Sequence, residues 1–172
     1  MKPEIYISRR RINSAVKRVA QEISADYSGK KPLIIGILKG SFIFLADLAR
    51  GLDFPLEMDF IRVSSYGNAT ETSGRVTLLL SPGIPVKGRH VLLVEDIIDS
   101  GLSIDFVAGL LQAEKPASLK ICALLDKPSR RKTQTTVDYV GFTVPDKFLV
   151  GYGLDFAEQY RNLPDICSME DK

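Results

Sequence analysis

Two carboxylates at the end of an apolar run, followed by a loop of small polar residues, are the part of this sequence best suited to chemistry. Residues 91–94 are apolar and lead directly into Glu95 and Asp96. Residues 99–103, which we call the phosphate loop, then read Asp-Ser-Gly-Leu-Ser. Ligands of open α/β sheets bind at the carboxyl ends of strands, and a helix beginning there offers unpaired N–H groups that suit a phosphate. The loop adds hydroxyl donors and a closely approachable backbone at Ser100, Ser103 and Gly101.

This pattern differs from the common nucleotide-binding motifs, because the segment contains neither GxxxxGK[ST] nor GxGxxG. Carboxylates beside a phosphate repel it unless sugar hydroxyls or a divalent cation intervene. A ribose 5-phosphate with a free 2,3-diol would satisfy both halves of the segment. A capped strand–helix turn with solvated acids is the structural alternative. Because neighbouring strand residues point to opposite faces, we expect the strand to end at Val94 if Glu95 and Asp96 both reach the diol.

The elements that must position this segment alternate between strands and helices. Strands are predicted over residues 33–38, 58–65, 76–80, 90–94, 119–125 and 137–144. Helices are predicted from Ser8 through the apolar face Ile12, Val16, Val19 and Ile23, over 42–50, and over 104–114. No repeat or linker divides the chain, so we expect one α/β domain over residues 1–172 with a parallel or mixed sheet covered on both faces.

Composition excludes several classes of function. The 172 residues carry 23 basic and 21 acidic side chains, a net charge of +2 that gives no general case for nucleic-acid binding. Two cysteines, Cys122 and Cys167, cannot make a disulfide framework or a zinc cluster. No secretion signal or membrane-spanning run is present, so we expect a reduced, cytoplasmic protein that binds neither nucleic acid nor membrane.

The segment around Glu95 resembles the motif that binds phosphoribosyl pyrophosphate (PRPP) in type I phosphoribosyltransferases. From about Ile5 to Cys167 the chain resembles the hypoxanthine–guanine group of that family. The resemblance is carried by five motifs in order: Leu38-Lys39-Gly40, Ser65-Tyr66-Gly67, residues 95–103, Leu125-Asp126-Lys127 and residues 145–155. It implies the type I phosphoribosyltransferase fold, a mainly parallel central sheet flanked by helices plus a small hood formed by the chain ends.

The resemblance implies roles for the PRPP half of the site. Glu95 and Asp96 would contact the ribose hydroxyls, and the phosphate loop would wrap the 5-phosphate through Asp99, Ser100, Gly101, Leu102 and Ser103. Relatives often carry a polar or basic residue in place of Leu102, which would contribute mainly its backbone. Asp99 would be the catalytic residue, exchanging a proton with purine N7. Pyrophosphate would be bound by Lys39, Gly40 and Arg161.

The resemblance also implies a purine pocket and a metal. Lys127 would donate to the purine 6-oxo group, which suits a side chain that has no acceptor. Phe148 would stack on the base, and the backbone of Leu149 would read its exocyclic edge. Asp155, beside the purine, would hold a second Mg²⁺. The implied cofactor is Mg²⁺, with Glu95, Asp96 and Asp155 as its candidate ligands.

A polar stretch from Ser65 to Gly74 separates two predicted strands, and long polar loops are often lids over sites. An oxocarbenium-like sugar must be shielded from water, so the loop is expected to close over it. Ser65 and Tyr66, at its start, would contact pyrophosphate. A plain surface connection is the alternative.

The implied activity is purine salvage: transfer of 5-phosphoribosyl from PRPP to N9 of hypoxanthine, guanine or xanthine, giving the nucleotide and pyrophosphate. A regulator on the same fold that senses PRPP or nucleotide is the alternative, and a pyrimidine- or xanthine-specific enzyme is a second one. The resemblance also suggests a homodimer or homotetramer. Two basic triplets are left outside the site. Arg9-Arg10-Arg11 is interpreted as a solvated helix face, with a nucleic-acid patch as the alternative. Arg130-Arg131-Lys132, either a solvated loop or a subunit contact, receives no role.

Overall fold

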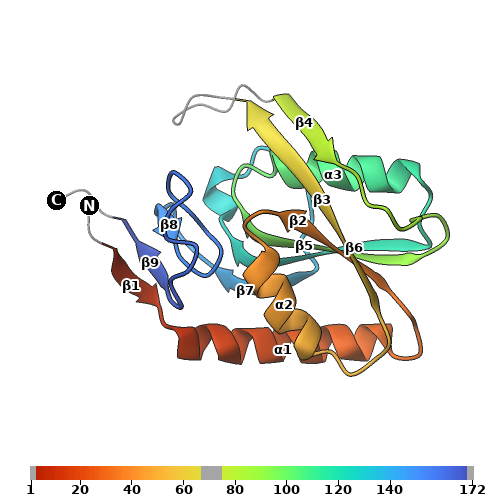
Figure 1. Ribbon diagram of the computed structural model, residues 1–172, viewed down its shortest axis with the longest axis horizontal. Helices are drawn as coiled ribbons and strands as arrows, with labels where there is room; N and C mark the ends of the chain where they lie inside the picture. The colour runs from red at the N-terminus through yellow and green to blue at the C-terminus, as the bar shows by residue number, and fades with distance from the viewer. Residues whose placement is uncertain (1–2, 67–74, 170–172) are drawn as a thin grey trace.

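A six-stranded sheet forms the centre of the protein (Figure 1), in the order β4-β3-β2-β5-β6-β7. The computed structural model describes residues 3–66 and 75–169. The strands are β2 (Leu33–Leu38), β3 (Glu57–Tyr66), β4 (Arg75–Leu80), β5 (His90–Ile98), β6 (Ser118–Asp126) and β7 (Tyr139–Thr143). All neighbours are parallel except β3 and β4, which run antiparallel. The predicted mixed, mainly parallel sheet is therefore confirmed.

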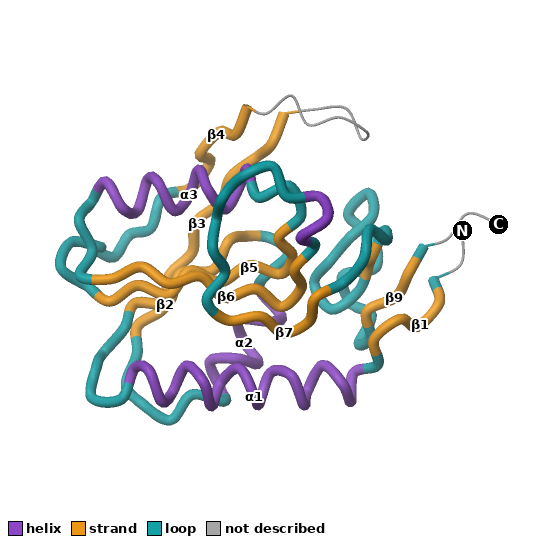
Figure 2. Tube along the Cα trace, turned by 180° about the vertical axis from the view of Figure 1, so that it is seen from behind, coloured by secondary structure: helices purple, strands orange, loops and turns teal. Residues whose placement is uncertain are grey.

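The helices cover both faces of this sheet. Helices α1 (Arg9–Tyr27) and α2 (Phe42–Arg50) lie on one face and α3 (Leu102–Ala113) on the other (Figures 1 and 2). A short 3₁₀ turn, η1 (Pro128–Arg130), follows β6. The predicted apolar face of α1 is buried at Ile12, Val16, Val19 and Ile23. Each such aliphatic side chain contributes about 1.5–3 kcal/mol on burial.

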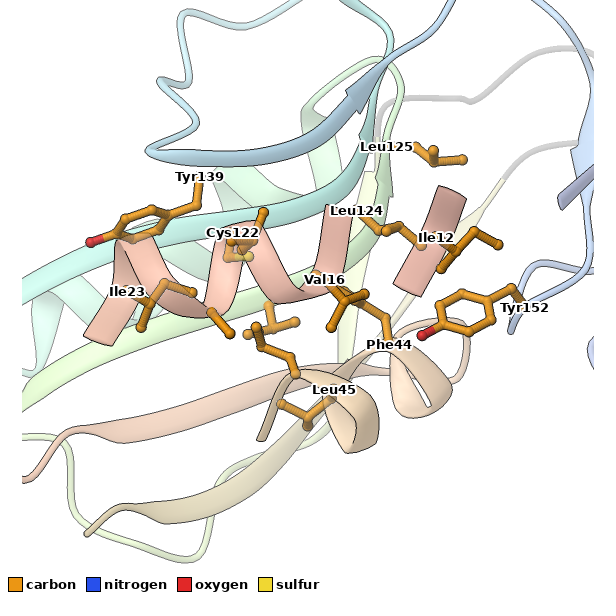
Figure 3. Close-up of a cluster of buried hydrophobic side chains, with 14 of the residues drawn as sticks. Ile12, Val16, Ile23, Phe44, Leu45, Cys122, Leu124, Leu125, Tyr139 and Tyr152 are labelled. Atoms are coloured by element: carbon orange, nitrogen blue, oxygen red, sulfur yellow. The ribbon is translucent and has the colours of Figure 1, made fainter. Parts of the chain in front are cut away.

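The central strands are apolar on both sides because helices cover both sides. In β2 every residue from Leu33 to Ile37 is buried, and in β5 the same holds from Val91 to Asp96. Below the sheet, side chains of α1 and α2 interleave with those of β6 around Cys122 and Leu124 (Figure 3). Cys122 and Cys167 are both free and buried, and burial raises the pKa of the Cys122 thiol.

The chain ends form a second, three-stranded antiparallel sheet, in the order β1-β9-β8. Its strands are β1 (Glu4–Ile7), β8 (Leu149–Val150) and β9 (Ile166–Ser168). Ile7, Leu149 and Ile166 from this sheet join the same hydrophobic cluster as α1 and α2. The sheet is the predicted hood, and this shared core fixes its place beside β7 and α1 (Figure 2).

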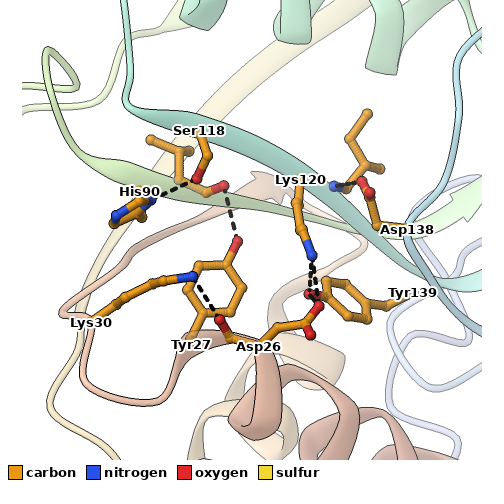
Figure 4. Close-up of polar contacts among 10 residues, drawn as sticks. Asp26, Tyr27, Lys30, His90, Ser118, Lys120, Asp138 and Tyr139 are labelled. Atoms are coloured by element: carbon orange, nitrogen blue, oxygen red, sulfur yellow. Dashed lines mark hydrogen bonds and ion pairs between the residues drawn. The ribbon is translucent and has the colours of Figure 1, made fainter.

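A polar cluster ties the end of α1 to the amino-terminal part of the central sheet (Figure 4). Asp26 Oδ2 accepts hydrogen bonds from Lys120 Nζ and Tyr139 OH, each over 2.6 Å. The hydrogen bond from Lys120, followed in size of effect by that from Tyr139, holds the pKa of Asp26 below its usual value. The cluster lies at the amino-terminal end of β6, away from the strand ends where ligands bind. Within the described residues, no helix is both long and apolar enough to span a bilayer.

Candidate active site

A cavity of about 280 Å³ opens at the carboxyl ends of β2 and β5. From these two neighbouring strands the chain continues to opposite edges of the sheet, to β3 and β4 on one side and to β6 and β7 on the other. Such a switch point is where open α/β sheets bind their ligands. The cavity brings together ten of the predicted site residues: Lys39, Gly40, Glu95, Asp96, Asp99, Ser100, Gly101, Ser103, Asp155 and Arg161.

The prediction that β5 ends at Val94 is wrong, since the strand continues to Ile98. Its pairing with β2, however, stops at the Gly36–Val94 pair, whereas its pairing with β6 runs on to Ile98. Beyond Val94 one edge of β5 is therefore released from β2, and the cavity lies at that edge. Glu95 and Asp96 both line the cavity although they are successive strand residues.

The acidic pair is buried, with each residue only 8% exposed. Glu95 Oε1 accepts a hydrogen bond from the Asp96 backbone N–H over 3.1 Å, so the Glu95 side chain folds back along the chain. Burial, reinforced by the neighbouring Asp96 carboxyl, raises the pKa of Glu95 well above its usual value. A sugar hydroxyl or a cation at this point would favour the ionised form of Glu95.

Gly40 lies directly against Asp96. A Cβ at position 40 would come 1.8 Å from Asp96 Oδ2, so a side chain there would displace the Asp96 carboxylate. The peptide bond between Leu38 and Lys39 is cis. The close approach of Gly40 to Asp96 places the backbone of the Lys39–Gly40 turn beside the acidic pair.

Gly153, which follows the hood strand β8, packs against this turn from the other side. It has a φ of +103°, and a Cβ there would lie 2.1 Å from the Gly40 carbonyl oxygen. Tyr152 OH donates to Asp47 Oδ2 over 2.5 Å, which ties the same segment to α2. The hood is therefore held against the wall of the cavity.

Replacing Gly153 with Ala should displace the Lys39–Gly40 turn and weaken the pyrophosphate binding that the family resemblance implies there by about tenfold, since strain at a functional site costs about 1–3 kcal/mol. Thermal unfolding and pyrophosphate titration measure the two effects. Gly88→Ala is the matched control, because Gly88 also has a positive φ, +71°, but has open space around it. If both variants bind pyrophosphate as the wild type does, the packing of Gly153 on Gly40 has no role in the site.

The phosphate loop joins the end of β5 to the start of α3. Gly101 adopts a φ of +85° and caps the helix, and its carbonyl accepts the Asp105 N–H over 2.9 Å. Leu102, the first residue of α3, is partly buried and is not among the residues that line the cavity. The hydroxyl-bearing residues Ser100 and Ser103 both line the cavity, at the positive end of the helix dipole.

Asp99 and Lys127 lie close together although 28 positions separate them in the chain. Lys127 is only 5% exposed, and its backbone N–H donates to the Ile98 carbonyl over 3.0 Å. Its Nζ lies 3.9 Å from Asp99 Oδ2, and Arg130 Nε lies 2.9 Å from Asp99 Oδ1. The Arg130 contact is an ion pair without hydrogen-bond geometry, since Asp99 Oδ1 is buried and receives no hydrogen bond from the described residues. A buried lysine beside a carboxylate is a specific feature, unlike a solvated surface charge.

Phe148 and Leu149 lie on the hood, outside the residues that line the cavity. The Phe148 side chain is 51% exposed and meets Phe156 edge to ring, with centroids 5.5 Å apart. An exposed aromatic face suits stacking better than a core role. Leu149 is buried, and its backbone pairs with Ser168 in the hood sheet.

Arg161 and Lys39 lie at the mouth of the cavity within a small ionic network. Arg161 Nη2 pairs with Asp155 Oδ1 over 2.8 Å, and its Nη1 donates to the Gly153 carbonyl. Glu158 bridges the two cations, at 2.9 Å from Lys39 Nζ and 3.4 Å from Arg161 Nη2. Lys39 and then Arg161 hold the pKa of Glu158 below its usual value.

The side chains of the predicted lid residues, Ser65 and Tyr66, fall outside the described part of the structure, as do residues 67–74. The backbone of Ser65 pairs with Val76, and that of Tyr66 with Arg75 at the end of the β3–β4 ladder. The lid stays a prediction.

Three residues that contact the site were not predicted from the sequence: Arg130, Arg131 and Glu158. Arg130 pairs with Asp99, Arg131 Nε donates to the Asp99 carbonyl over 3.4 Å, and Glu158 pairs with Lys39. The only available signal for the arginines was their position directly after the Lys127 motif. A basic triplet in a loop has the same composition whether it is solvated or packed.

Comparisons with known proteins identify the family of the chain. A profile of the phosphoribosyl transferase domain matches residues 5–157, which defines the class of the protein. The hypoxanthine-guanine phosphoribosyltransferase of Bacillus subtilis (strain 168) is 50% identical over 163 residues, covering 95% of this chain and 91% of the relative. That of Aquifex aeolicus (strain VF5) is 44% identical, covering 99% and 96%. A crystal structure of a hypoxanthine-guanine phosphoribosyltransferase from Bacillus anthracis, with HEPES in its active site, superposes with a TM-score of 0.92 at 48% identity, covering 97% of this chain and 98% of the other.

The chain belongs to the hypoxanthine-guanine phosphoribosyltransferase family of purine salvage enzymes, within the type I phosphoribosyltransferase fold. The regulatory alternative is not favoured, because the relatives that match nearly the whole chain are transferases.

Proposed function

We propose that the enzyme transfers 5-phosphoribosyl from PRPP to N9 of a 6-oxopurine, namely hypoxanthine, guanine or xanthine, and releases pyrophosphate. One observation carries the proposal: the acidic pair and the phosphate loop line one cavity, and Lys127 is buried beside Asp99 at its edge. A plain capped turn would need neither a buried acidic pair nor a buried lysine.

The PRPP half of the reaction would use the floor of the cavity. Glu95 and Asp96 would accept hydrogen bonds from the ribose diol, and the phosphate loop would bind the 5-phosphate through backbone N–H groups, Ser100 and Ser103. Lys39, the Gly40 backbone and Arg161 would bind pyrophosphate. The buried Arg161 Nε, which has no hydrogen-bond partner among the described residues, supports an anionic ligand there.

The purine would lie between the phosphate loop and the hood. Lys127 would donate to the 6-oxo group, while Asp99 would exchange the N7 proton. The half-exposed Phe148 would stack on the base, and the backbone of Leu149 would contact the exocyclic edge. Asp155, at the mouth of the cavity, would sit between purine and pyrophosphate.

The chemistry would be a displacement at ribose C1 with oxocarbenium character. Binding the phosphate and the diol at one end of the sugar would hold C1 facing N9, so that remote binding energy orients the reacting atoms. Buried carboxylates next to the sugar would stabilise its developing positive charge. Asp99 contributes the proton transfer on the purine.

The residues fit Mg²⁺, because Glu95, Asp96 and Asp155 offer only oxygen donors. Within the described chain, no three histidine, cysteine or acidic side chains converge into a cage. Mg²⁺ keeps several waters and shares phosphate oxygens, so such an open set of carboxylates suits it. When bound, the ion would neutralise charge on the pyrophosphate leaving group.

Incubation with PRPP, Mg²⁺ and each of several bases tests the activity by following nucleotide formation. We expect IMP, GMP or XMP to form, and no product from pyrimidines. A purified enzyme that forms no nucleotide from any 6-oxopurine refutes the proposal.

Removing divalent metal with a chelator should abolish nucleotide formation. Adding excess Mg²⁺ or Mn²⁺ should restore it, since both ions prefer oxygen ligands. Sugar-phosphate transfer assays before and after dialysis measure this. Undiminished activity in the chelator would contradict the metal assignment.

We also infer a homodimer or homotetramer in the cytoplasm. The half-exposed Leu79 and Leu80 on the edge strand β4 support self-association, and the free thiols of Cys122 and Cys167 suit a reducing compartment. Light scattering on the purified enzyme measures the assembly.

A further inference from the structure

The loop that begins with the 3₁₀ turn η1 packs directly against the phosphate loop. We call residues 128–135 the bracing loop. The Lys132 backbone N–H donates to the Ser100 carbonyl over 2.8 Å. At Gly101 a Cβ would come 2.2 Å from Thr133 Oγ1 and 2.7 Å from Arg131 Cδ, so the two loops touch with no space between them.

Arg131 is the most firmly held side chain of the bracing loop. Its Nη2 forms an ion pair with Asp126 Oδ1, its Nη1 donates to the Thr135 carbonyl over 3.1 Å, and its Nε donates to the Asp99 carbonyl over 3.4 Å. The side chains of Arg131 and Asp126 are only 15% and 17% exposed. Each of its three nitrogens therefore contacts a different part of the chain.

Two of these partners, Asp126 and Asp99, lie on the segments that carry the two halves of the site. Asp126 is the last residue of β6 and precedes the base-reading Lys127. Asp99 begins the phosphate loop at the end of β5. Thr135 Oγ1 in turn donates to Asp105 Oδ1 over 3.0 Å, which extends the contact to the first turn of α3. Arg131 thus connects the segment of Lys127, which would bind the base, to the phosphate loop.

Arg131 is not among the residues that line the cavity, so its effect on the reaction must pass through its partners. We propose that Arg131 is a positioning residue, which holds the phosphate loop and Asp99 at a fixed place relative to Lys127. This proposal rests on the transfer reaction proposed above. These contacts of Arg131 set the distance between the bound 5-phosphate and Asp99, which exchanges the proton of purine N7. A displacement of about 1 Å between such groups costs about 10²-fold in rate.

The planar guanidinium is what makes the three contacts compatible. A lysine carries its charge on one nitrogen, so it can pair with Asp126 but cannot also reach the carbonyls of Asp99 and Thr135. Arg131→Lys therefore keeps the charge beside the partly buried Asp126 while it removes the contacts to the Asp99 and Thr135 carbonyls. This variant separates positioning from folding.

Arg131→Lys is expected to fold and melt like the wild type, to raise KM for PRPP, and to lower kcat by about tenfold or more. Arg131→Ala should lose about 10²-fold in kcat, and part of the loss should return when guanidinium is added below denaturing concentrations. Lys132→Ala is the matched control, because Lys132 is exposed and acts through its backbone N–H. It should keep wild-type kinetics and gain nothing from guanidinium.

Wild-type kcat and KM for a well-folded Arg131→Lys enzyme would overturn the proposal. An Arg131→Ala enzyme that loses activity only in proportion to its unfolded fraction, without guanidinium rescue, would overturn it as well. Failure of the proposed transfer reaction is a separate result, because the wild-type enzyme itself would then form no nucleotide.

Discussion

Asp99→Asn should bind PRPP almost as the wild type does and lose turnover by about 10²-fold or more, the usual contribution of a general acid–base group. Asparagine keeps the shape of the side chain and its place beside Lys127 and Arg130, which lie 3.9 and 2.9 Å from the two carboxylate oxygens. It cannot exchange a proton with purine N7. Steady-state kinetics in both directions, with a separate PRPP titration, measure the two effects.

Asp146→Asn is the control for this variant. Asp146 is exposed and accepts from the same Arg130, at 3.3 Å, but it does not line the cavity. If the Asp146 variant loses as much turnover as the Asp99 variant, the loss of a carboxylate partner of Arg130 explains the effect, and Asp99 has no catalytic role. Normal turnover of the Asp99→Asn enzyme would have the same meaning.

Strand and helix positions could be predicted where burial leaves a simple pattern. Residues 33–38 and 42–50 form β2 and α2 with the predicted bounds, because a strand buried on both faces and a one-sided helix differ clearly in periodicity. The end of β5 could not be predicted in this way. Glu95 and Asp96 look like a strand terminus in the sequence, yet β6 continues to pair with β5 after β2 has turned away.

The site residues, like the secondary structure, divide into those that could be predicted from the local sequence and those that could not. The acidic pair and the phosphate loop are contiguous, so their chemistry was readable from local order. Lys39 and Arg161 lie far apart in the chain, and only the resemblance to a family joined them at one cavity. Arg131 had no such signal, because its role depends on Asp126 and Asp99, which the fold brings within its reach.

Adenine should be a very poor substrate compared with hypoxanthine, by about 10⁴-fold in kcat/KM, because a buried polar group left without its partner is a strong basis for discrimination. Lys127 can only donate, so it fits the 6-oxo group and opposes a 6-amino group. The lysine cannot turn away into water to escape this mismatch, since only 5% of it is exposed and its backbone N–H is held by Ile98. Nucleotide formation from the two bases, each at saturating PRPP and Mg²⁺, measures the ratio.

Lys127→Gln shows whether the lysine is the source of this preference. A glutamine amide can donate to a 6-oxo group or accept from a 6-amino group, so the ratio between the bases should fall while turnover of hypoxanthine also falls. Lys132 lies five positions after Lys127, in the bracing loop, and is exposed. Lys132→Gln therefore makes the same change at an exposed lysine and should leave the ratio unaltered. Comparable kcat/KM for adenine and hypoxanthine in the wild type would show that Lys127 does not read the base. An unchanged ratio in Lys127→Gln would instead assign the discrimination to the backbone around Leu149, which contacts the other edge of the purine in the proposed complex.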